Sequence, residues 1–105
     1  MRIQVELWLW LNKELRGDFQ FPSEMRSFGE MDLEEGLTAI QLFDRLAAQH
    51  PIIEEKIFDR KNGKFLPNLS LIVTQNGQVV SPFNMEKSVL KDGYKVTVLP
   101  LYAGG

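Results

Sequence analysis

The chain has 105 residues, 44% of them hydrophobic and 25% charged, which is the size and balance of one globular domain. Twelve Lys and Arg against fourteen Asp and Glu give a formal net charge of -2, so the basic excess that drives nonspecific nucleic-acid binding is absent. No cysteine is present, which excludes disulfides, thiolate zinc sites and any sulfur carried on a thiol of this chain.

The first predicted strand lies within residues 2–12, where apolar side chains occupy every odd position from Ile3 to Leu11. Trp8 and Trp10 fall on the opposite face, together with polar residues. They form either an exposed aromatic patch that binds a partner or a patch covered by the phenylalanines of the next segment. The apolar run at 7–11 is shorter than the core of a signal peptide, so we expect a cytoplasmic protein.

The middle of the chain predicts one main helix. Residues 13–27 contain Gly, Pro and Ser and predict an irregular connection, and 28–33 predicts a second strand. Thr38 and Gln41 have the spacing of a capping box, and apolar residues then recur at three and four residue steps as far as His50. Pro51 ends that helix, and 52–58 predicts a turn or a single helical turn.

The last third predicts strands. Asn62 and Gly63 indicate a turn, 69–73 is an apolar strand, and the Asn76-Gly77 pair predicts a hairpin with 79–80 as its return strand. Residues 94–99 form the last predicted strand, after a turn at 91–93. The predicted order is β-β-α-β-β-β, which at this length indicates an α+β domain with one mixed sheet packed on one main helix.

Few side chains suggest catalysis or metal binding. His50 is the only histidine, and the expected reading is a solvated helix end. An acidic run precedes the helix, and its spacing fits the ordinary bias at a helix N-terminus better than a calcium loop or a catalytic pair. We therefore predict no metal site and no catalytic site. The acidic residues are Glu30, Asp32, Glu34 and Glu35.

The sequence closes on Gly104-Gly105, a few residues after the last predicted strand. Glycine has no Cβ, so such a tail can extend through a channel too narrow for other residues and present an unhindered carboxylate. A cloning scar is the simpler explanation for two terminal glycines. In the position that they occupy, they also predict a carboxylate that another enzyme modifies.

Several segments together resemble the MoaD/ThiS group of ubiquitin-like sulfur carrier proteins, and within it the chain looks closest to the MoaD branch, the small subunits of molybdopterin synthase. The segments are IQVELW at 3–8, KELRG at 13–17, GLT at 36–38, the Asn76-Gly77 hairpin, LKDGYKV at 90–96 and LPLYAGG at 99–105.

The resemblance implies a β-grasp fold, one domain over 1–105 with a flexible tail at 101–105, and a carrier role without catalysis. An E1-like enzyme would use ATP to adenylate Gly105, and sulfur transfer would then give a thiocarboxylate that serves molybdopterin synthesis. The alternatives are a sulfur carrier for thiamine thiazole or another thiolated product, and a ubiquitin-like protein modifier. The chain itself would bind no cofactor and would be a monomer when free. The partners would be the E1-like enzyme and the large synthase subunit or a thiazole synthase. The residues concerned are Gly105 for adenylation, Tyr102, Ala103 and Gly104 in the tail, and Trp8, Val79 and Leu99 as apolar contacts to partners.

Overall fold

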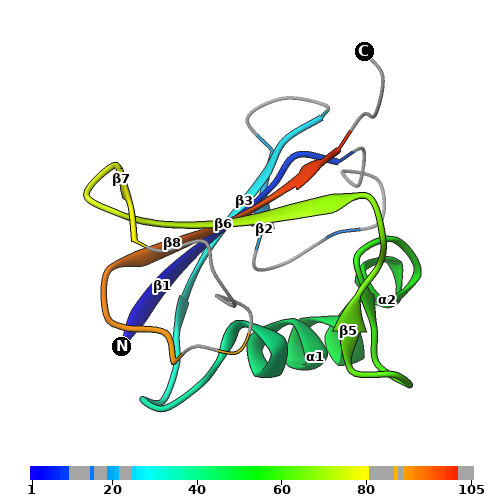
Figure 1. Cartoon of the computed structure of the whole chain (residues 1–105), viewed down its shortest axis with the longest axis horizontal. Coiled ribbons are helices and arrows are strands. Elements are labelled where there is room, and N and C mark those ends of the chain that lie inside the picture. Colours follow the sequence, from blue (N-terminus) through cyan, green and yellow to red (C-terminus); the bar gives the residue numbers. More distant parts are fainter. Residues whose placement is uncertain (10–14, 16–18, 22–24, 81–86, 88, 102–105) are drawn as a thin grey trace.

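The computed structural model describes residues 1–9, 15, 19–21, 25–80, 87 and 89–101. Their backbone forms one large sheet, one small hairpin and two helices (Figure 1). The elements are β1 (Arg2–Leu7), β2 (Phe19–Gln20), β3 (Ser27–Asp32), α1 (Ala39–Gln49), α2 (Pro51–Lys56), β4 (Phe58–Asp59), β5 (Lys64–Phe65), β6 (Leu69–Gln75), β7 (Gln78–Val79) and β8 (Tyr94–Pro100).

The large sheet has the strand order β2-β3-β1-β8-β6-β7. Its two middle strands, β1 and β8, are parallel, and every other pair in it is antiparallel. Figure 1 shows both helices on one side of this sheet. A mixed sheet whose middle strands come from the two ends of the chain, with α1 lying across one face, is the β-grasp arrangement that the resemblance predicts.

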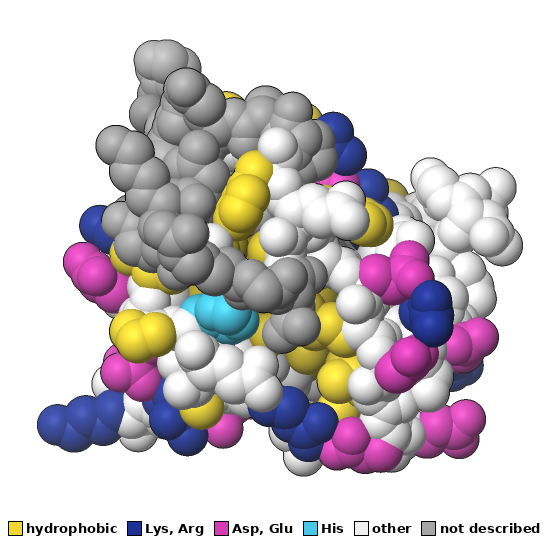
Figure 2. Space-filling model, turned by 180° about the vertical axis from the view of Figure 1, so that it is seen from behind, with side chains coloured by type: hydrophobic (Ala, Val, Ile, Leu, Met, Phe, Trp, Pro, Cys, Tyr) yellow, Lys and Arg dark blue, Asp and Glu magenta, His cyan; other side chains and the backbone are white. Residues whose placement is uncertain are grey.

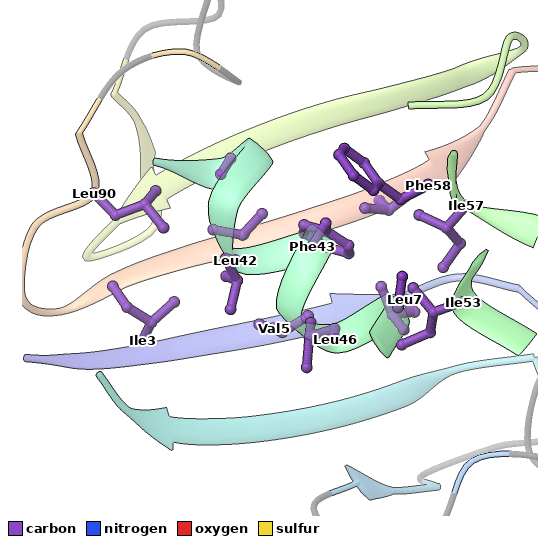
Figure 3. Close-up of a cluster of buried hydrophobic side chains, with 14 of the residues drawn as sticks. Ile3, Val5, Leu7, Leu42, Phe43, Leu46, Ile53, Ile57, Phe58 and Leu90 are labelled. Atoms are coloured by element: carbon purple, nitrogen blue, oxygen red, sulfur yellow. The ribbon is translucent and has the colours of Figure 1, made fainter. Parts of the chain in front are cut away.

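The core lies between the sheet and α1. Odd-numbered residues of β1 point toward the helix, and the apolar stripe of α1 points back at them (Figure 3). Each such side chain contributes roughly 1.5–3 kcal/mol when it is fully buried. The labelled members of this layer are Ile3, Val5 and Leu7 from β1 and Leu42, Phe43 and Leu46 from α1.

Helix α1 begins where the capping box predicts. The Thr38 hydroxyl accepts a hydrogen bond from the Gln41 backbone N–H at 3.2 Å, and the Gln41 side chain accepts one from the Thr38 N–H at 2.9 Å. These bonds satisfy two donors that a helix N-terminus otherwise leaves unpaired. The helix ends at Gln49, and Pro51 then occupies the first turn of α2, where its missing N–H costs nothing.

Three expectations for the middle of the chain need correction. The connection at 13–27 is not wholly irregular, because β2 lies inside it and β3 already begins at Ser27. The segment 52–58 belongs to a second helix, α2, and to β4, so the described residues contain two helices. The turn at 62–63 joins β4 to β5, a hairpin absent from the predicted order. Neither helix in the described part of the chain is long and apolar enough to cross a membrane.

The Asn76-Gly77 hairpin is confirmed. It joins β6 to β7, with Gln75 opposite Gln78. Both central residues have positive φ angles, 53° at Asn76 and 81° at Gly77, as the tightest two-residue turns between antiparallel strands require. The return strand covers Gln78–Val79, one residue earlier than predicted.

Candidate functional site

The side of the sheet that faces away from α1, here called the outer face, is the candidate functional surface. Successive side chains of a strand point to opposite faces, so the residues between the core positions of each strand share this face. The cross-strand register extends the face over four neighbouring strands. Its members at the centre are Gln4 and Glu6 of β1, Phe28 and Glu30 of β3, Lys95, Thr97 and Leu99 of β8, and Ser70, Ile72 and Thr74 of β6.

A buried carboxylate lies in the middle of the outer face. Glu6 sits between Phe28 on β3 and Thr97 on β8, and its side chain is only 4% exposed. One carboxylate oxygen lies 2.7 Å from the Lys95 amine, and the Arg26 guanidinium lies 3.0 Å from the other. The Arg26 guanidinium also lies over the Trp8 ring, 5.4 Å from its centroid. We call Glu6, Arg26, Lys95 and Trp8 the Glu6 cluster.

The charges of the cluster keep Glu6 ionised. Burial alone would raise the pKa of its carboxyl, because a charged group loses solvation in a less polar environment. The hydrogen bonds and positive charges of Lys95 and Arg26 outweigh that effect, so the pKa ends below its ordinary value. The carboxylate therefore stays negative at neutral pH, and both cations stay fixed next to it.

The predicted partner contacts lie on this face but not all together. Trp8 follows β1, and its backbone N–H donates to the Val98 carbonyl at 2.9 Å. Continuing the β1–β8 register from Leu7 opposite Val98 brings Trp8 beside Leu99. Val79 lies on the edge strand β7 opposite Thr74, two strands from β8 and toward the other end of the sheet. It is 59% exposed, whereas Trp8 and Leu99 are half-buried.

Trp8 is half-buried, and the Arg26 guanidinium lies over its ring, a neighbour that neither predicted environment includes. Phe19 points to the opposite side of the sheet and belongs to the core. Trp10, the second tryptophan of the predicted patch, lies outside the described residues.

Three of the four acidic residues before α1 form ion pairs, Glu35 is exposed, and none of the four lies in the first turn of that helix. Arg2 binds both Glu30 and Asp32 on the outer face, the latter at 3.1 Å. Glu34 binds Arg45 of α1. Figure 2 shows acidic and basic side chains beside one another at several places on the side of the molecule that it presents. The expected helix-terminus bias is thus corrected to pairing with arginines, and the described residues form no group that could hold a metal ion.

We expected His50 to be a solvated helix end. It instead lies at the junction between two helices. It follows the last residue of α1 and precedes the first of α2. Its ring packs edge-on against Phe19, with centroids 5.6 Å apart. The Nε2 atom is buried and has no hydrogen-bond partner among the described residues. The expectation failed because a six-residue helix that starts with proline gives little periodic signal.

The last strand leads directly to the predicted tail. The Leu101 N–H still donates to the Asn68 carbonyl at 2.8 Å, one residue beyond β8, while the Leu101 side chain is 56% exposed. Of the predicted tail at 101–105, the structure describes Leu101 alone. Its remaining residues, Tyr102, Ala103, Gly104 and Gly105, lie outside the described part.

On the helix side, a cavity of about 570 Å³ lies between α1, β5 and β6. Its walls are mainly apolar, with Phe65 and Leu71 among them, and Lys64 and Lys87 also line it. Leu101 borders it, but the outer face and the Glu6 cluster lie across the sheet. The cavity therefore adds nothing to the outer face as a binding surface.

Sequence reasoning missed the Glu6 cluster apart from Trp8. Alternation along β1 places Glu6 on the same face as Trp8, which is a usable signal. That Lys95 reaches it depends on the pairing of two strands that lie about ninety residues apart in the chain. That Arg26 reaches it depends on the path of the chain into β3. Neither follows from local pattern.

A β-grasp domain whose middle strand runs out toward a Gly-Gly sequence has the architecture of ubiquitin-like carrier and modifier proteins. The model of the ThiS family matches residues 19–105, and the chain belongs to this family. The resemblance to the MoaD/ThiS group is thereby confirmed. Small proteins of this class are generally substrates of E1-like activating enzymes rather than catalysts.

Solved structures share the fold at low sequence identity. Small archaeal modifier protein 1 of Haloferax volcanii superposes with a TM-score of 0.60 at 18% identity, over 100% of both chains. A second crystal structure of that modifier gives 0.60 at 17% identity, over 96% of this chain and 98% of the other. The HVO 2177 protein of the same organism gives 0.61 at 18% identity, over 100% of this chain and 87% of the other. None of the curated proteins matches the chain.

Proposed function

We propose that this chain is a sulfur carrier for molybdopterin synthesis, with the Gly105 carboxylate as the carrier group. The observation that carries the proposal is the family match, which extends from β2 through the last strand to Gly104-Gly105. The fold supports it, because β8 is a middle strand of the sheet and the last described backbone hydrogen bond is at Leu101. A firmly held strand thus ends a few residues before Gly105 in the sequence.

The chemistry divides between this chain and its partners. An E1-like enzyme would join the Gly105 carboxylate oxygen to the α-phosphorus of ATP and release pyrophosphate. Hydrosulfide would then attack the carboxyl carbon and displace AMP, which leaves a thiocarboxylate. A cysteine persulfide of a partner could attack in its place, and a second thiol would then cleave the S–S bond of the resulting acyl disulfide to release the same thiocarboxylate. Cysteines carry sulfur in this form, and this chain has no cysteine. The sulfur relay would therefore belong to the partners, with ATP bound by the E1-like enzyme.

The outer face is the docking surface in this proposal. Trp8 and Leu99 offer adjacent half-buried apolar side chains, and Val79 offers an exposed one at the far edge. Aromatic and aliphatic anchors of this kind are typical of binding hot spots. The E1-like enzyme and the large synthase subunit would both use this face, in turn, because both must reach the same terminus.

Intact-mass measurement tests the carrier step. After incubation of the chain with the E1-like enzyme, ATP and a sulfur donor, we expect the exchange of one oxygen for one sulfur. The variant that lacks Gly105 should keep its circular dichroism spectrum and its melting temperature but show no exchange. An unchanged mass of the full chain with an enzyme that is active on its own carrier would refute the proposal.

Two alternatives have specific tests. The fold shared with a small archaeal modifier protein favours a modifier role, in which Gly105 would be joined to lysines of other proteins. Gly-Gly remnants on target lysines after proteolysis would support that role. A carrier for thiamine thiazole synthesis would differ only in the acceptor. Capture with the intact chain should then retrieve a thiazole synthase, whereas the main proposal expects a molybdopterin synthase large subunit.

A further inference from the structure

The Glu6 carboxylate is buried at a position where an apolar side chain would lose less free energy of solvation. It lies between Phe28 and Thr97, in the centre of a face whose other members are largely half-buried. Taking a carboxylate and its cations out of water costs free energy, and well-packed apolar side chains in place of a buried ion pair are often as stable or more stable. A buried ion pair is therefore weak evidence for stability, and the cluster calls for another explanation.

The cluster presents a net positive charge to solvent. One carboxylate is paired with two cations, so the sum is one positive charge. Glu6 is 4% exposed, whereas the Arg26 and Lys95 side chains are 37% and 33% exposed. A group that approaches the outer face at this point therefore contacts the two cations, while the carboxylate is almost inaccessible to it.

The cations are held in place before anything binds. Arg26 makes two contacts to Glu6, from Nε at 3.0 Å and from Nη2 at 3.1 Å, and its guanidinium carbon lies over the Trp8 ring, 5.4 Å from the centroid. A guanidinium has five N–H donors, so donors remain for a further acceptor. Fixing a long side chain in advance lowers the entropy cost of binding. Glu6 thus acts as a positioning residue for Arg26 and Lys95.

We propose that the Glu6 cluster recognises a carboxylate side chain of a partner protein, while Trp8 and Leu99 pack against an apolar residue next to that carboxylate. Charge complementarity selects an acidic group, and the adjacent indole selects an apolar neighbour. The inference deepens the docking role of the outer face and rests on that part of the proposed function. It does not depend on the chemistry of Gly105.

A peptide titration followed by NMR tests the inference on the full chain. The probe is a short capped peptide in which leucine and glutamate alternate, and its matched control carries glutamine in place of glutamate. We expect the glutamate peptide to shift the resonances of the Trp8 indole and of residues around Glu6, Arg26 and Lys95. Its affinity should exceed that of the glutamine peptide by about tenfold, the ratio that one well-placed charged contact supplies.

Variants separate charge from folding. Lys95→Gln should lower the affinity for the glutamate peptide to near that of the glutamine peptide, and Lys95→Arg should restore it. Lys64→Gln removes an equal charge at an exposed position of β5, on the helix side of the sheet, and should change nothing. The chain without Gly105 should bind the peptide like the full chain, although it cannot form a thiocarboxylate, so the two proposals can fail separately.

Three results would overturn the inference. The glutamate and glutamine peptides could bind equally, which would leave no role for charge. Inorganic phosphate at matched ionic strength could shift the same resonances as strongly as the peptide, which would indicate a general anion site. The glutamate peptide could also leave all of these resonances unmoved.

Discussion

The two faces of the central sheet are built from alternate residues of the same strands, yet they differ in composition. On the helix side, Val5 of β1 lies opposite Val96 of β8, and both are fully buried under α1. One residue further along, Glu6 lies opposite Thr97 on the outer face, and two cations surround it. The step of a single residue separates a continuous apolar layer from a charged centre with an aromatic rim.

This difference indicates where stability and recognition reside. The helix side gains free energy from every buried apolar group, roughly in proportion to the area removed from water. The outer face places a carboxylate where burial is costly, and it keeps half-buried apolar side chains uncovered by either helix. A surface of that composition is better suited to specific contact than to holding the domain together.

The largest effect should come from the helix side. Phe43→Ala removes a fully buried ring that packs edge-on against Phe65, with centroids 5.0 Å apart. We expect a loss of about 3–5 kcal/mol in the free energy of unfolding. Val79→Ala on the outer face should change it by less than about 0.5 kcal/mol. Urea denaturation measures both, and losses of similar size would contradict the division between the faces.

The next largest effect on the free energy of unfolding should come from the Glu6 cluster. Glu6→Gln keeps the shape of the side chain but removes its charge beside Arg26 and Lys95, and should cost about 1–3 kcal/mol at neutral pH. The pKa of Glu6 is lowered in the folded chain. Its stabilising contribution is therefore fully present above the pKa of the unfolded chain and is lost as the pH falls through the lower folded value.

Urea denaturation at a series of pH values measures this contribution. The gap in stability between the natural chain and Glu6→Gln should narrow as the pH falls from neutral through the acidic range below 4.5, the ordinary value for Glu. The matched control is Glu35→Gln, an exposed position in the turn before α1. A gap that stays constant with pH would mean that Glu6 is not held ionised by its neighbours.

Much of the fold could be predicted because its main elements carry periodic patterns. Alternation identifies β1, the three-and-four spacing with the Thr38 box identifies α1, and the Asn76-Gly77 pair identifies the β6–β7 hairpin. The elements that were missed are two to six residues long. Strands β2, β4 and β5 span two residues each, too few to alternate, and they form because Phe19, Phe58 and Phe65 reach the core.

Less of the candidate site could be predicted. The resemblance supplied Trp8, Val79 and Leu99, and the structure brings the first and last of these together. The Glu6 cluster joins residues from the start, the first quarter and the end of the chain. Such a group exists only once the parallel pairing of β1 and β8 fixes which residues are neighbours. Local alternation indicates the face on which a residue lies, but not which residue of a distant strand becomes its neighbour.

A smaller effect tests the cap at the start of the helix layer. Thr38→Ala removes the hydroxyl that accepts from the Gln41 N–H, and should lower the free energy of unfolding by about 1 kcal/mol. Thr38→Ser keeps an oxygen at the same place and should recover most of the loss. Hydrogen exchange of the first-turn amides of α1 would localise the change. Equal losses in both variants would indicate that packing of the threonine methyl group, not capping, matters.

The smallest effect on stability concerns Glu34, an exposed carboxylate that contrasts with buried Glu6. Its pKa should nevertheless change clearly. Hydrogen bonds from Arg45, and then from the backbone, lower the pKa of Glu34 to about 2. Because this ion pair lies in solvent, it contributes little to folding. Arg45→Gln should therefore leave the unfolding curve almost unchanged while the pKa of Glu34, followed by NMR, rises toward its ordinary value. Lys95→Gln should instead change both the free energy of unfolding and the pKa of Glu6, since that carboxylate is buried. A pKa of Glu34 that stays near 2 without Arg45 would assign the shift to the backbone hydrogen bond.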